Sequence, residues 1–502
     1  MTTPQFDPGP GSIAELSAAL ESGALTAVDL VETYLARIAQ LDSLTHAIVE
    51  INPDARAIAE QLDAERRAGQ VRSAVHGIPV ILKDNIDTAD RMQTTAGSLA
   101  LVGSSATQDA GVVERLRAAG AIILAKANLS EWANYRSVRS SSGWSGRGRQ
   151  TRNPYVLDRT PSGSSSGSAV AAAANFAPAT VGTETNGSIT SPAGACGVVG
   201  IKPTVGLTSR AGVIPIAHSQ DTVGPMARSV ADAALMLGAM VGVDPRDPAT
   251  SVAEGGAYTD YAQFLDANGL RGARIGVARE CYTGYSEHTD AIFEAALAVL
   301  REAGATLIDP ADIPTAREIA ARPATVLDYE LKADLNAYLA SRPDLAIHNL
   351  ADLIAYNEEH AAEEMPYFRQ ELLLRAQATI GLDDPAYLEV LATNQRLARE
   401  EGIDAVLQQY DLDALVAPTN APAFAIDQIN GNRNMGGSST PAALAGYPLV
   451  TVPAGYAFGL PVNITFMGTA YSEPTLIRLA HAFEQAAGVW QAPQFLPTLE
   501  LP

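Results

Sequence analysis

The stretch TPSGSSSGSAVAAAANFAPATVGTETNGSITSPAGACGVVGIKPTVG, residues 160–206, places an alanine-rich segment between two serine-containing turns. Gly163 and Gly167 bracket the first turn, and glycine permits the tight backbone conformations that such a turn needs. The run that begins at Ser168 consists of small helix-forming residues, which allow close packing. A flexible Ser/Gly linker would not continue in this way. We therefore predict an ordered turn followed by a packed helix.

The second turn, residues 183–189, follows a short apolar segment at 179–182 that we predict to be a buried strand. This turn presents Ser188 beside successive backbone N–H groups, and a row of such groups can bind an oxyanion. A serine hydroxyl is a weak nucleophile until a base takes its proton. Ser188 therefore needs a base nearby if it is to react.

Lys83 is our candidate for that base, because it ends the apolar run 80–82. Apolar surroundings disfavour the charged form of a lysine, so the pKa of its amine falls and the amine can accept a proton. Ser-Lys pairs serve hydrolases that lack a catalytic histidine. We interpret His76 and His218 as structural, and Asp221 as a buried support for the second turn.

The Lys83 segment and the two serine turns together resemble the amidase signature family of serine hydrolases, including the 24-residue separation between Ser164 and Ser188. The resemblance implies that Ser188 is the nucleophile and Lys83 the terminal base. It implies that Ser164 bridges them, often after a cis peptide bond. It also implies an oxyanion hole formed by the backbone N–H groups of Thr185, Asn186, Gly187 and Ser188.

Three positions depart from the family pattern. Glu184, Asn186 and Thr190 stand where the family usually has an aspartate, a glycine and an arginine. Because the backbone makes the oxyanion contact, Asn186 need not disturb it, and asparagine tolerates left-handed dihedrals better than most residues. The missing arginine argues against a carboxylate-bearing substrate held at position 190.

Further segments are similar to the bacterial peptide amidase branch of this family, namely residues 128–134, 142–145, 150–155, 219–230, 351–357 and 466–474. The resemblance covers about residues 12–485 and implies one amidase signature domain over residues 1–502. Trp132 and Asn134 lie between the lysine and the serines in sequence, so we consider them for substrate binding. Core packing or a surface position is an equal alternative for both.

The order of elements along the chain predicts an α/β fold, with a large mixed, mostly parallel central sheet covered by helices on both faces. Ser12 with Glu15 and Thr26 with Asp29 form capping-box patterns before apolar periodic runs. Residues 316–409 are acidic, helical in composition and without a strand-like run, so we predict a helical subregion there that could shape a substrate cleft. The other predicted helices are 12–22, 26–41, 54–68, 110–119, 230–243, 289–303 and 474–487, and the predicted strands include 77–83, 121–125, 272–278, 413–419, 449–453 and 462–467.

Composition limits the partners. The formal net charge of −22 opposes nucleic acid and anionic membranes, whereas neutral or cationic ligands fit better. Only Cys196 and Cys281 occur, so we expect no disulfide framework, and no histidine or cysteine spacing indicates a metal site. No signal peptide or membrane span is visible. We expect a cytoplasmic protein as encoded, with export of a precursor left open, acting as a monomer or homodimer.

These observations lead to one functional hypothesis with two alternatives. The hypothesis is hydrolysis of a carboxamide without a cofactor, through Lys83, Ser164 and Ser188, with the C-terminal amide of a peptide as the first substrate class. One alternative is a broad amidase that acts on aryl amides, lactams or carbamates. The other is a glutamine amidotransferase A-type subunit, which would need partner subunits and ATP.

Overall fold

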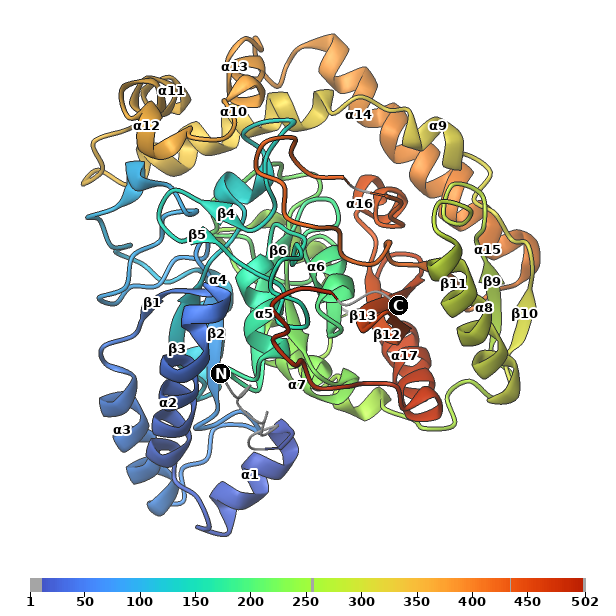
Figure 1. Ribbon diagram of the computed structural model, residues 1–502, viewed down its shortest axis with the longest axis horizontal. Coiled ribbons are helices and arrows are strands. Elements are labelled where there is room, and N and C mark those ends of the chain that lie inside the picture. The colour runs from blue at the N-terminus through green and yellow to red at the C-terminus, as the bar shows by residue number, and fades with distance from the viewer. Residues whose placement is uncertain (1–10, 254–256, 434, 500–502) are drawn as a thin grey trace.

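The computed structural model describes residues 11–253, 257–433 and 435–499 (Figure 1). Its centre is an eleven-stranded mixed sheet in the order β1-β3-β2-β6-β8-β7-β12-β13-β11-β9-β10. These strands are β1 (Ile48–Ile51), β2 (Pro79–Lys83), β3 (Ile122–Ala127), β6 (Ala179–Glu184), β7 (Val199–Lys202), β8 (Thr222–Ala227), β9 (Arg274–Val277), β10 (Thr306–Ile308), β11 (Ala414–Pro418), β12 (Leu449–Ala457) and β13 (Leu460–Met467). A two-stranded ribbon pairs β4 (Trp144–Ser145) with β5 (Arg149–Gln150).

Helices precede, separate and follow these strands. Those outside the segment 316–410 are α1 (Ile13–Glu21), α2 (Ala27–Thr45), α3 (Ala55–Arg67), α4 (Gly111–Ala118), α5 (Ser166–Ala173), α6 (Thr190–Ala195), α7 (Val230–Met240), α8 (Glu287–Glu302), α16 (Thr440–Ala445) and α17 (Glu473–Ala487). Short 3₁₀ turns occur at Leu99–Leu101, Glu131–Asn134, Pro248–Ala253 and Ala262–Phe264. Both predicted capping boxes are present, at Ser12 with Glu15 and at Thr26 with Asp29.

The predicted α/β class, a large mixed sheet with helices on both faces, is confirmed, but the sheet was predicted to be mostly parallel and its central pairings are antiparallel. Parallel pairing joins β3, β2 and β6 on one side of the sheet and β11, β9 and β10 on the other. Between these two blocks, from β6 to β11, each neighbouring pair is antiparallel. The antiparallel stretch arises because β12 and β13 form a hairpin and β8 returns beside β7 and β6, without a crossover helix.

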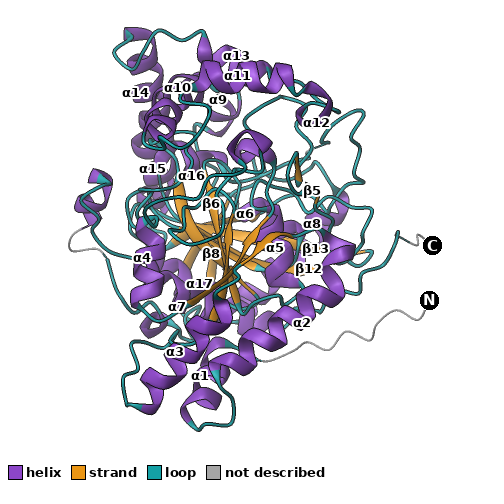
Figure 2. Cartoon of the chain, turned by 90° about the vertical axis from the view of Figure 1, so that its left-hand side faces the viewer, coloured by secondary structure: helices purple, strands orange, loops and turns teal. Residues whose placement is uncertain are grey.

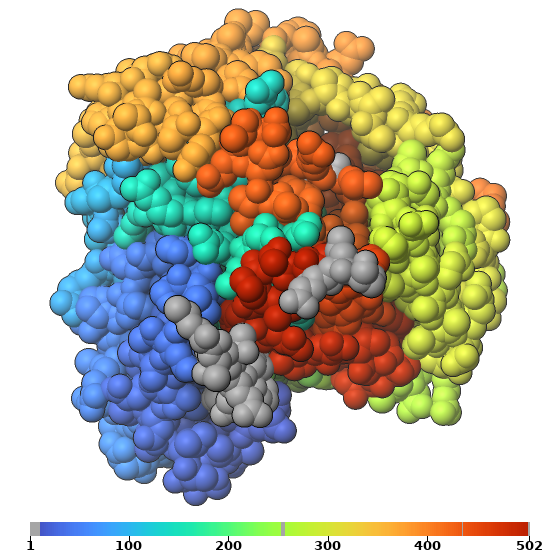
Figure 3. Space-filling view, in the orientation of Figure 1, coloured from blue at the N-terminus to red at the C-terminus, as the bar shows by residue number. Residues whose placement is uncertain are grey.

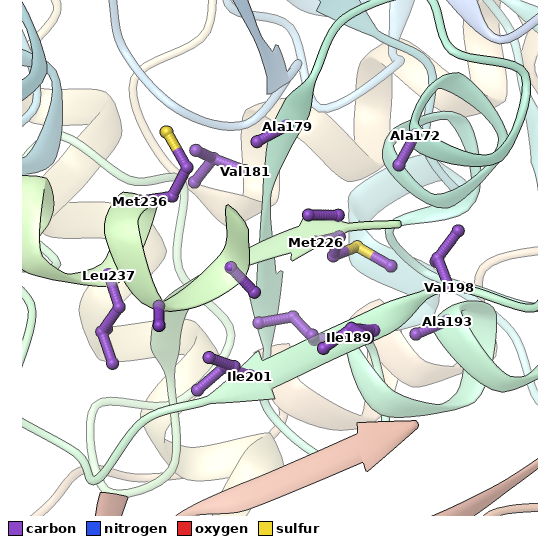
Figure 4. Packing of buried hydrophobic residues seen from close by; sticks show 14 of the residues in the cluster. Ala172, Ala179, Val181, Ile189, Ala193, Val198, Ile201, Met226, Met236 and Leu237 are labelled. Carbon is purple, nitrogen blue, oxygen red and sulfur yellow. The ribbon is translucent and has the colours of Figure 1, made fainter. Parts of the chain in front are cut away.

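The main hydrophobic core joins residues of the sheet to residues of the helices that surround it, and Figure 2 shows the strands enclosed by these helices. Helices α5 and α6 contact each other and pack on the strands β6, β7 and β12, while α4, α7, α17 and α8 form a second connected layer. Figure 4 shows this packing around β6, β8 and β7, where Met236 and Leu237 of α7 approach from one side and Ala172 of α5 from another. Small residues in α5 let this helix lie close to the sheet, as its sequence predicts.

Residues 316–410, of which 316–409 were predicted to be helical, form an arch of helices along the top and right of Figure 1, and no strand lies among them in the described structure. The helices are α9 (Ala316–Ala320), α10 (Thr325–Ala340), α11 (Leu350–Glu359), α12 (Ala361–Glu364), α13 (Glu371–Gln377), α14 (Pro385–Ala398), a π-helical turn (Arg399–Ile403) and α15 (Asp404–Tyr410). A second apolar cluster joins Leu335 of α10 and Leu353 of α11 to Leu129 and Trp132. This cluster ties the arch to the loop that leads toward Ser164.

Across the residues that have a described structure, none of the helices is long and apolar enough to cross a membrane.

Leu297 and Leu388 allow a test of this core. Leu297 of α8 is fully buried in the main cluster, whereas Leu388 of α14 is half exposed. We expect Leu297→Ala to lower the free energy of unfolding by about 2–5 kcal/mol because it leaves a cavity, and Leu388→Ala to change it by about 0.5 kcal/mol or less. Thermal and denaturant unfolding followed by circular dichroism measure both. Equal losses in the two variants would contradict the assigned core.

Candidate active site

Two neighbouring parallel strands bring the predicted base and the second serine turn together. The register of β2 on β6 pairs Val80 with Ala179 and Leu82 with Val181. Lys83 therefore ends its strand beside Thr183, near the point where β6 gives way to the turn. All residues of both strands are buried. The carboxyl ends of adjacent parallel strands thus define the location of the site.

Lys83 is fully buried and hydrogen-bonded on several sides. Its Nζ lies 2.7 Å from Ser164 Oγ, 2.8 Å from Thr183 Oγ1 and 3.3 Å from the carbonyl oxygen of Thr183. Burial lowers the pKa of the Lys83 amine to about 7, although the charges of Asp221 and Glu184 act in the opposite direction. A large fraction of the amine is therefore neutral near pH 7.

The first serine turn is held by close backbone contacts. The peptide bond between Gly163 and Ser164 is cis, as the family resemblance implied. A Cβ atom at Gly163 would lie 2.2 Å from Ser130 Oγ, and one at Gly167 would lie 2.3 Å from the carbonyl oxygen of Ala47. Glycine is therefore required at both ends of the turn. Ser130 N also donates to the carbonyl oxygen of Ser164.

The second turn is fixed by the carboxylate of Glu184, which is buried. Glu184 Oε2 accepts hydrogen bonds from the backbone N–H groups of Ile189 at 2.7 Å and Thr190 at 2.9 Å. The same carboxylate acts electrostatically on two buried lysines, because its charge raises the pKa of Lys83 and of Lys202 against the lowering that burial causes. Glu184, at the position where the family usually has an aspartate, thus fixes the turn and acts on both lysines.

Four consecutive backbone N–H groups of this turn are free to bind a ligand. Within the described parts of the chain, no group accepts a hydrogen bond from the N–H of Thr185, Asn186, Gly187 or Ser188. Gly187 has a left-handed φ of 84°, whereas the φ of Asn186 is not left-handed, so a side chain is tolerated at position 186. The Asn186 side chain instead accepts from Ser439 Oγ at 2.7 Å. Such a nest of N–H donors suits a developing oxyanion.

Asp221 supports the second turn from behind, as the sequence predicted. Its carboxylate accepts from Thr185 Oγ1 at 2.6 Å and from the backbone N–H groups of Ile216 and Ala217 at 2.8 and 2.9 Å. Burial raises the pKa of Asp221 to about 6 against these hydrogen bonds. Above that pH, its negative charge faces the buried amine of Lys83.

A backbone hydrogen bond connects the turn of Ser164 to the turn of Ser188. Ser165 N donates to the carbonyl oxygen of Ser188 at 3.1 Å, which fixes one turn against the other. The part of the chain that is described contains no hydrogen bond between the hydroxyls of Ser188 and Ser164. Catalytic hydrogen bonds often tighten only when substrate binds. The geometry accordingly joins Lys83 directly to Ser164 and brings Ser188 beside this pair.

Ser188 opens into a cavity of about 400 Å³. Its walls come from distant parts of the chain, namely Asn134, Ser142, Thr160, Ser162, Gly163, Asn186, Ser191, Ala195, Cys281, residues 420–424, Met435, Gly436, Gly437, Ser439 and Thr440. Asn432 and Ser142 tie two of the surrounding loops together, with Asn432 Nδ2 donating to Ser142 Oγ at 2.7 Å. Figure 3 shows these loops side by side on the face that it presents. A cavity of this size accommodates a small ligand or part of a peptide.

Asn134 lies on this cavity wall, whereas Trp132 does not. Asn134 Oδ1 is buried and has no hydrogen-bond partner among the described residues, so it can accept from a ligand. Trp132 is buried in the apolar cluster under the helical arch. Both residues, with Ala133 between them, have left-handed φ angles. Trp132 therefore packs in the core and fixes the segment that carries Asn134.

The histidines lie outside this arrangement. His76 is buried, with Nε2 3.0 Å from the carbonyl oxygen of Leu62. His218 is exposed and lies beside the buried Glu330 and the partly exposed Asp334, with their ligand-type atoms within 4.8 Å of one another. Glu330 accepts from the hydroxyl of Tyr387 and Asp334 lies 2.8 Å from His218 Nδ1, so these groups satisfy one another. Hydrogen bonds within the protein thus account for this cluster.

Several site residues were not predicted from the sequence. Thr183 and Asn85 hold the lysine network, since Asn85 Nδ2 donates to Thr183 Oγ1 at 3.0 Å. Cys281 lines the cavity with a left-handed φ of 70°. Thr183 lies within the motif and could have been proposed as a partner of Lys83. No local pattern points to Cys281, which reaches the cavity only through the tertiary fold.

Known proteins resemble this chain over nearly its full length. A family model described as Amidase matches residues 29–477. The native peptide amidase from Stenotrophomonas maltophilia is 49% identical, with a TM-score of 0.93 over 98% of this chain and 99% of that chain. A probable amidase from Arabidopsis thaliana is 43% identical over 97% of this chain and 91% of its own length. The A-type subunit of glutamyl-tRNA(Gln) amidotransferase from Chloroflexus aggregans is 36% identical over 94% of this chain and 96% of its own length.

Fold, motifs and these matches define an enzyme that hydrolyses amide bonds. The chain belongs to the amidase family, and the resemblance to the amidase signature family that its serine turns indicated is confirmed.

Glu184 offers a test of how the second turn is held. We expect Glu184→Ala to lower the free energy of unfolding by about 3 kcal/mol, because two buried N–H groups lose their acceptor. Glu184→Gln removes the charge but keeps one acceptor oxygen, so its loss should be about half as large. Thermal unfolding of the three proteins provides the comparison. An unchanged midpoint in Glu184→Ala would show that the turn does not depend on this carboxylate.

Proposed function

We propose that this chain hydrolyses the C-terminal amide of peptides, with Ser188 as nucleophile, Ser164 as bridging serine and Lys83 as base. The observation that carries the proposal is the contact of a fully buried lysine, whose pKa is lowered to about 7, with Ser164 Oγ at 2.7 Å. A neutral amine at this position can accept a proton from Ser164.

The reaction begins when neutral Lys83 takes the proton of Ser164, and Ser164 takes that of Ser188. Ser188 Oγ then attacks the carbonyl carbon, and the resulting oxyanion is stabilised by the N–H groups of residues 185–188. The relay returns a proton to the leaving nitrogen, which departs as ammonia. Water then cleaves the acyl-enzyme and releases the carboxylic acid, so that one amide and one water give one acid and one ammonia.

Peptide amides are the preferred substrate class for two reasons. The cavity beside Ser188 extends to the loops at 420–440, so there is room for more than the carboxamide itself. The 49% identical relative is named a peptide amidase. Aryl amides, lactams and carbamates remain the alternative class, because the helical arch that could shape the outer cleft carries no substrate-specific motif.

An amidotransferase A-type role is the second candidate function, favoured by the 36% identity to the amidotransferase chain from Chloroflexus aggregans. Thr190 argues against it. Thr190 is buried, and its N–H and hydroxyl face Glu184 at 2.9 and 3.2 Å. Position 190 therefore supplies no cation for the carboxylate of a free glutamine. Activity of the purified chain without partner or ATP separates the two functions.

The purified chain alone should release ammonia from an acetylated tetrapeptide amide faster than it cleaves the matching anilide or carbamate. Ser188→Ala should reduce this rate by several orders of magnitude, because the other members of the triad are useless without the nucleophile. Ser191→Ala removes a hydroxyl from the same cavity wall and should stay within about tenfold of wild type. An ammonia assay measures all three proteins. Full activity in the Ser188→Ala variant would contradict the assignment of Ser188 as the nucleophile.

The pH dependence of kcat/KM should report the protonation of Lys83. Activity requires the neutral amine, so kcat/KM should rise with pH through an inflection near the lowered pKa of about 7. The charge of Asp221 raises the pKa of Lys83. Asp221→Asn should therefore move the inflection to lower pH, by about one unit. Asp334→Asn, whose charge does not act on Lys83, is the control, and an unshifted profile in Asp221→Asn would exclude Lys83 as the titrating group.

A further inference from the structure

The cavity beside Ser188 has a wall without charge. Of the residues that the structure describes, those that line this cavity include neither aspartate, glutamate, lysine, arginine nor histidine. Charged residues make up 18% of the chain, so this composition differs sharply from the average. Cys281 is the one ionisable side chain among the described lining residues. The lining otherwise consists of asparagine, serine, threonine, glycine, alanine, proline, phenylalanine and methionine.

The absence of charge is particular to this cavity. A second cavity, of about 500 Å³, lies next to the first, since Thr185 lines it and the following residue, Asn186, lines the cavity of Ser188. Its walls carry Asp221, Arg210 and Arg342 among other charged groups. Of these two neighbouring cavities, one is therefore lined by charged side chains and the other is not.

The polar groups of the uncharged wall are largely engaged with one another. Asn186 pairs with Ser439 and Thr440, and Asn420 Nδ2 donates to the carbonyl oxygen of Ser191 at 3.0 Å. These neutral dipoles can accept a hydrogen-bonding or apolar side chain. They cannot neutralise a full charge that has lost its hydration, and an unpaired charge in such a place is strongly disfavoured.

We propose that this wall makes the enzyme select against a charged side chain on the residue that carries the amide. The inference rests on the proposed function and names its substrate class: peptide amides whose terminal residue is neutral. Glutamine, asparagine, leucine or methionine at that position fit the cavity. Glutamate, aspartate or lysine there loses part of its hydration without gaining a partner of opposite charge, so their kcat/KM should be at least about 100-fold lower.

Long-range repulsion must be separated from this local effect. The chain carries a net charge of −22 and repels any acidic peptide before contact. That repulsion acts on the whole peptide and is screened by salt over about 8–10 Å at physiological ionic strength. The local effect depends on which residue enters the cavity. Two peptides of identical composition and net charge distinguish the two effects.

The experiment compares the amides acetyl-Glu-Ala-Ala-Gln-NH₂ and acetyl-Gln-Ala-Ala-Glu-NH₂ by ammonia release at pH 8, in low and high salt. We expect the first peptide to exceed the second by at least about 100-fold in kcat/KM, with the ratio maintained in high salt. A second pair of peptide amides, with Nε-acetyl-lysine or lysine as the terminal residue, tests the effect of a positive charge on kcat/KM. Here too the neutral residue should be preferred.

A variant places a charge in the wall. Met435 lines the cavity and is half exposed, so a longer polar side chain can be accommodated there. Met435→Arg should raise the rate for terminal glutamate relative to terminal glutamine by at least about tenfold, because it supplies the missing partner charge. Met435→Gln is the neutral control and should leave the ratio unchanged. Thermal unfolding verifies that both variants are folded.

The outcomes separate the inference from the proposed function. If both isomeric peptides are hydrolysed within about threefold of each other, the proposed function stands and the selection against charge is wrong. If the preference disappears in high salt, long-range repulsion is its cause and the inference is overturned. If no peptide amide releases ammonia, the proposed function itself fails and the inference fails with it.

Discussion

A buried lysine that lacks an ion pair is the constraint around which this enzyme is arranged. The amine of Lys83 lies at the end of a fully buried strand, and in the described structure no carboxylate comes within salt-bridge distance of it. Desolvation disfavours its charge, while Asp221 and Glu184 limit the effect from farther away. The sheet must place β2 beside β6 in one register for the amine to meet Ser164 and Thr183 together. The strand order, both serine turns and the supporting carboxylates all help to hold the amine in contact with Ser164 and Thr183.

Much of the site could be predicted because its central residues lie in local patterns. Gly163 and Gly167 mark the first turn, and the steric contacts of their missing Cβ atoms explain why glycine occurs there. The apolar run before Lys83 indicated burial correctly. Asp221 was expected to support the second turn, and it accepts hydrogen bonds from Thr185 and two backbone N–H groups. These features depend on short-range chemistry that a sequence displays directly.

The remainder depends on tertiary contacts that local patterns do not encode. The antiparallel centre of the sheet arises from the way β8, β7 and the β12–β13 hairpin fold back, which alternating helices and strands did not reveal. Trp132 and Asn134 were indistinguishable in sequence, yet one packs in the core and the other lines the cavity. Cys281 and the loop at 435–440 line the same cavity although more than 150 residues separate them in the sequence.

Two cavities with different linings border the site. Asp221, whose charge acts on the amine, and Thr183, which accepts its hydrogen bonds, border the charged cavity. Ser188 and the backbone around it border the neutral cavity. The charged groups that act on the amine and the neutral groups around Ser188 thus belong to separate sets of residues. Either set can change during evolution, or be engineered, while the other is preserved.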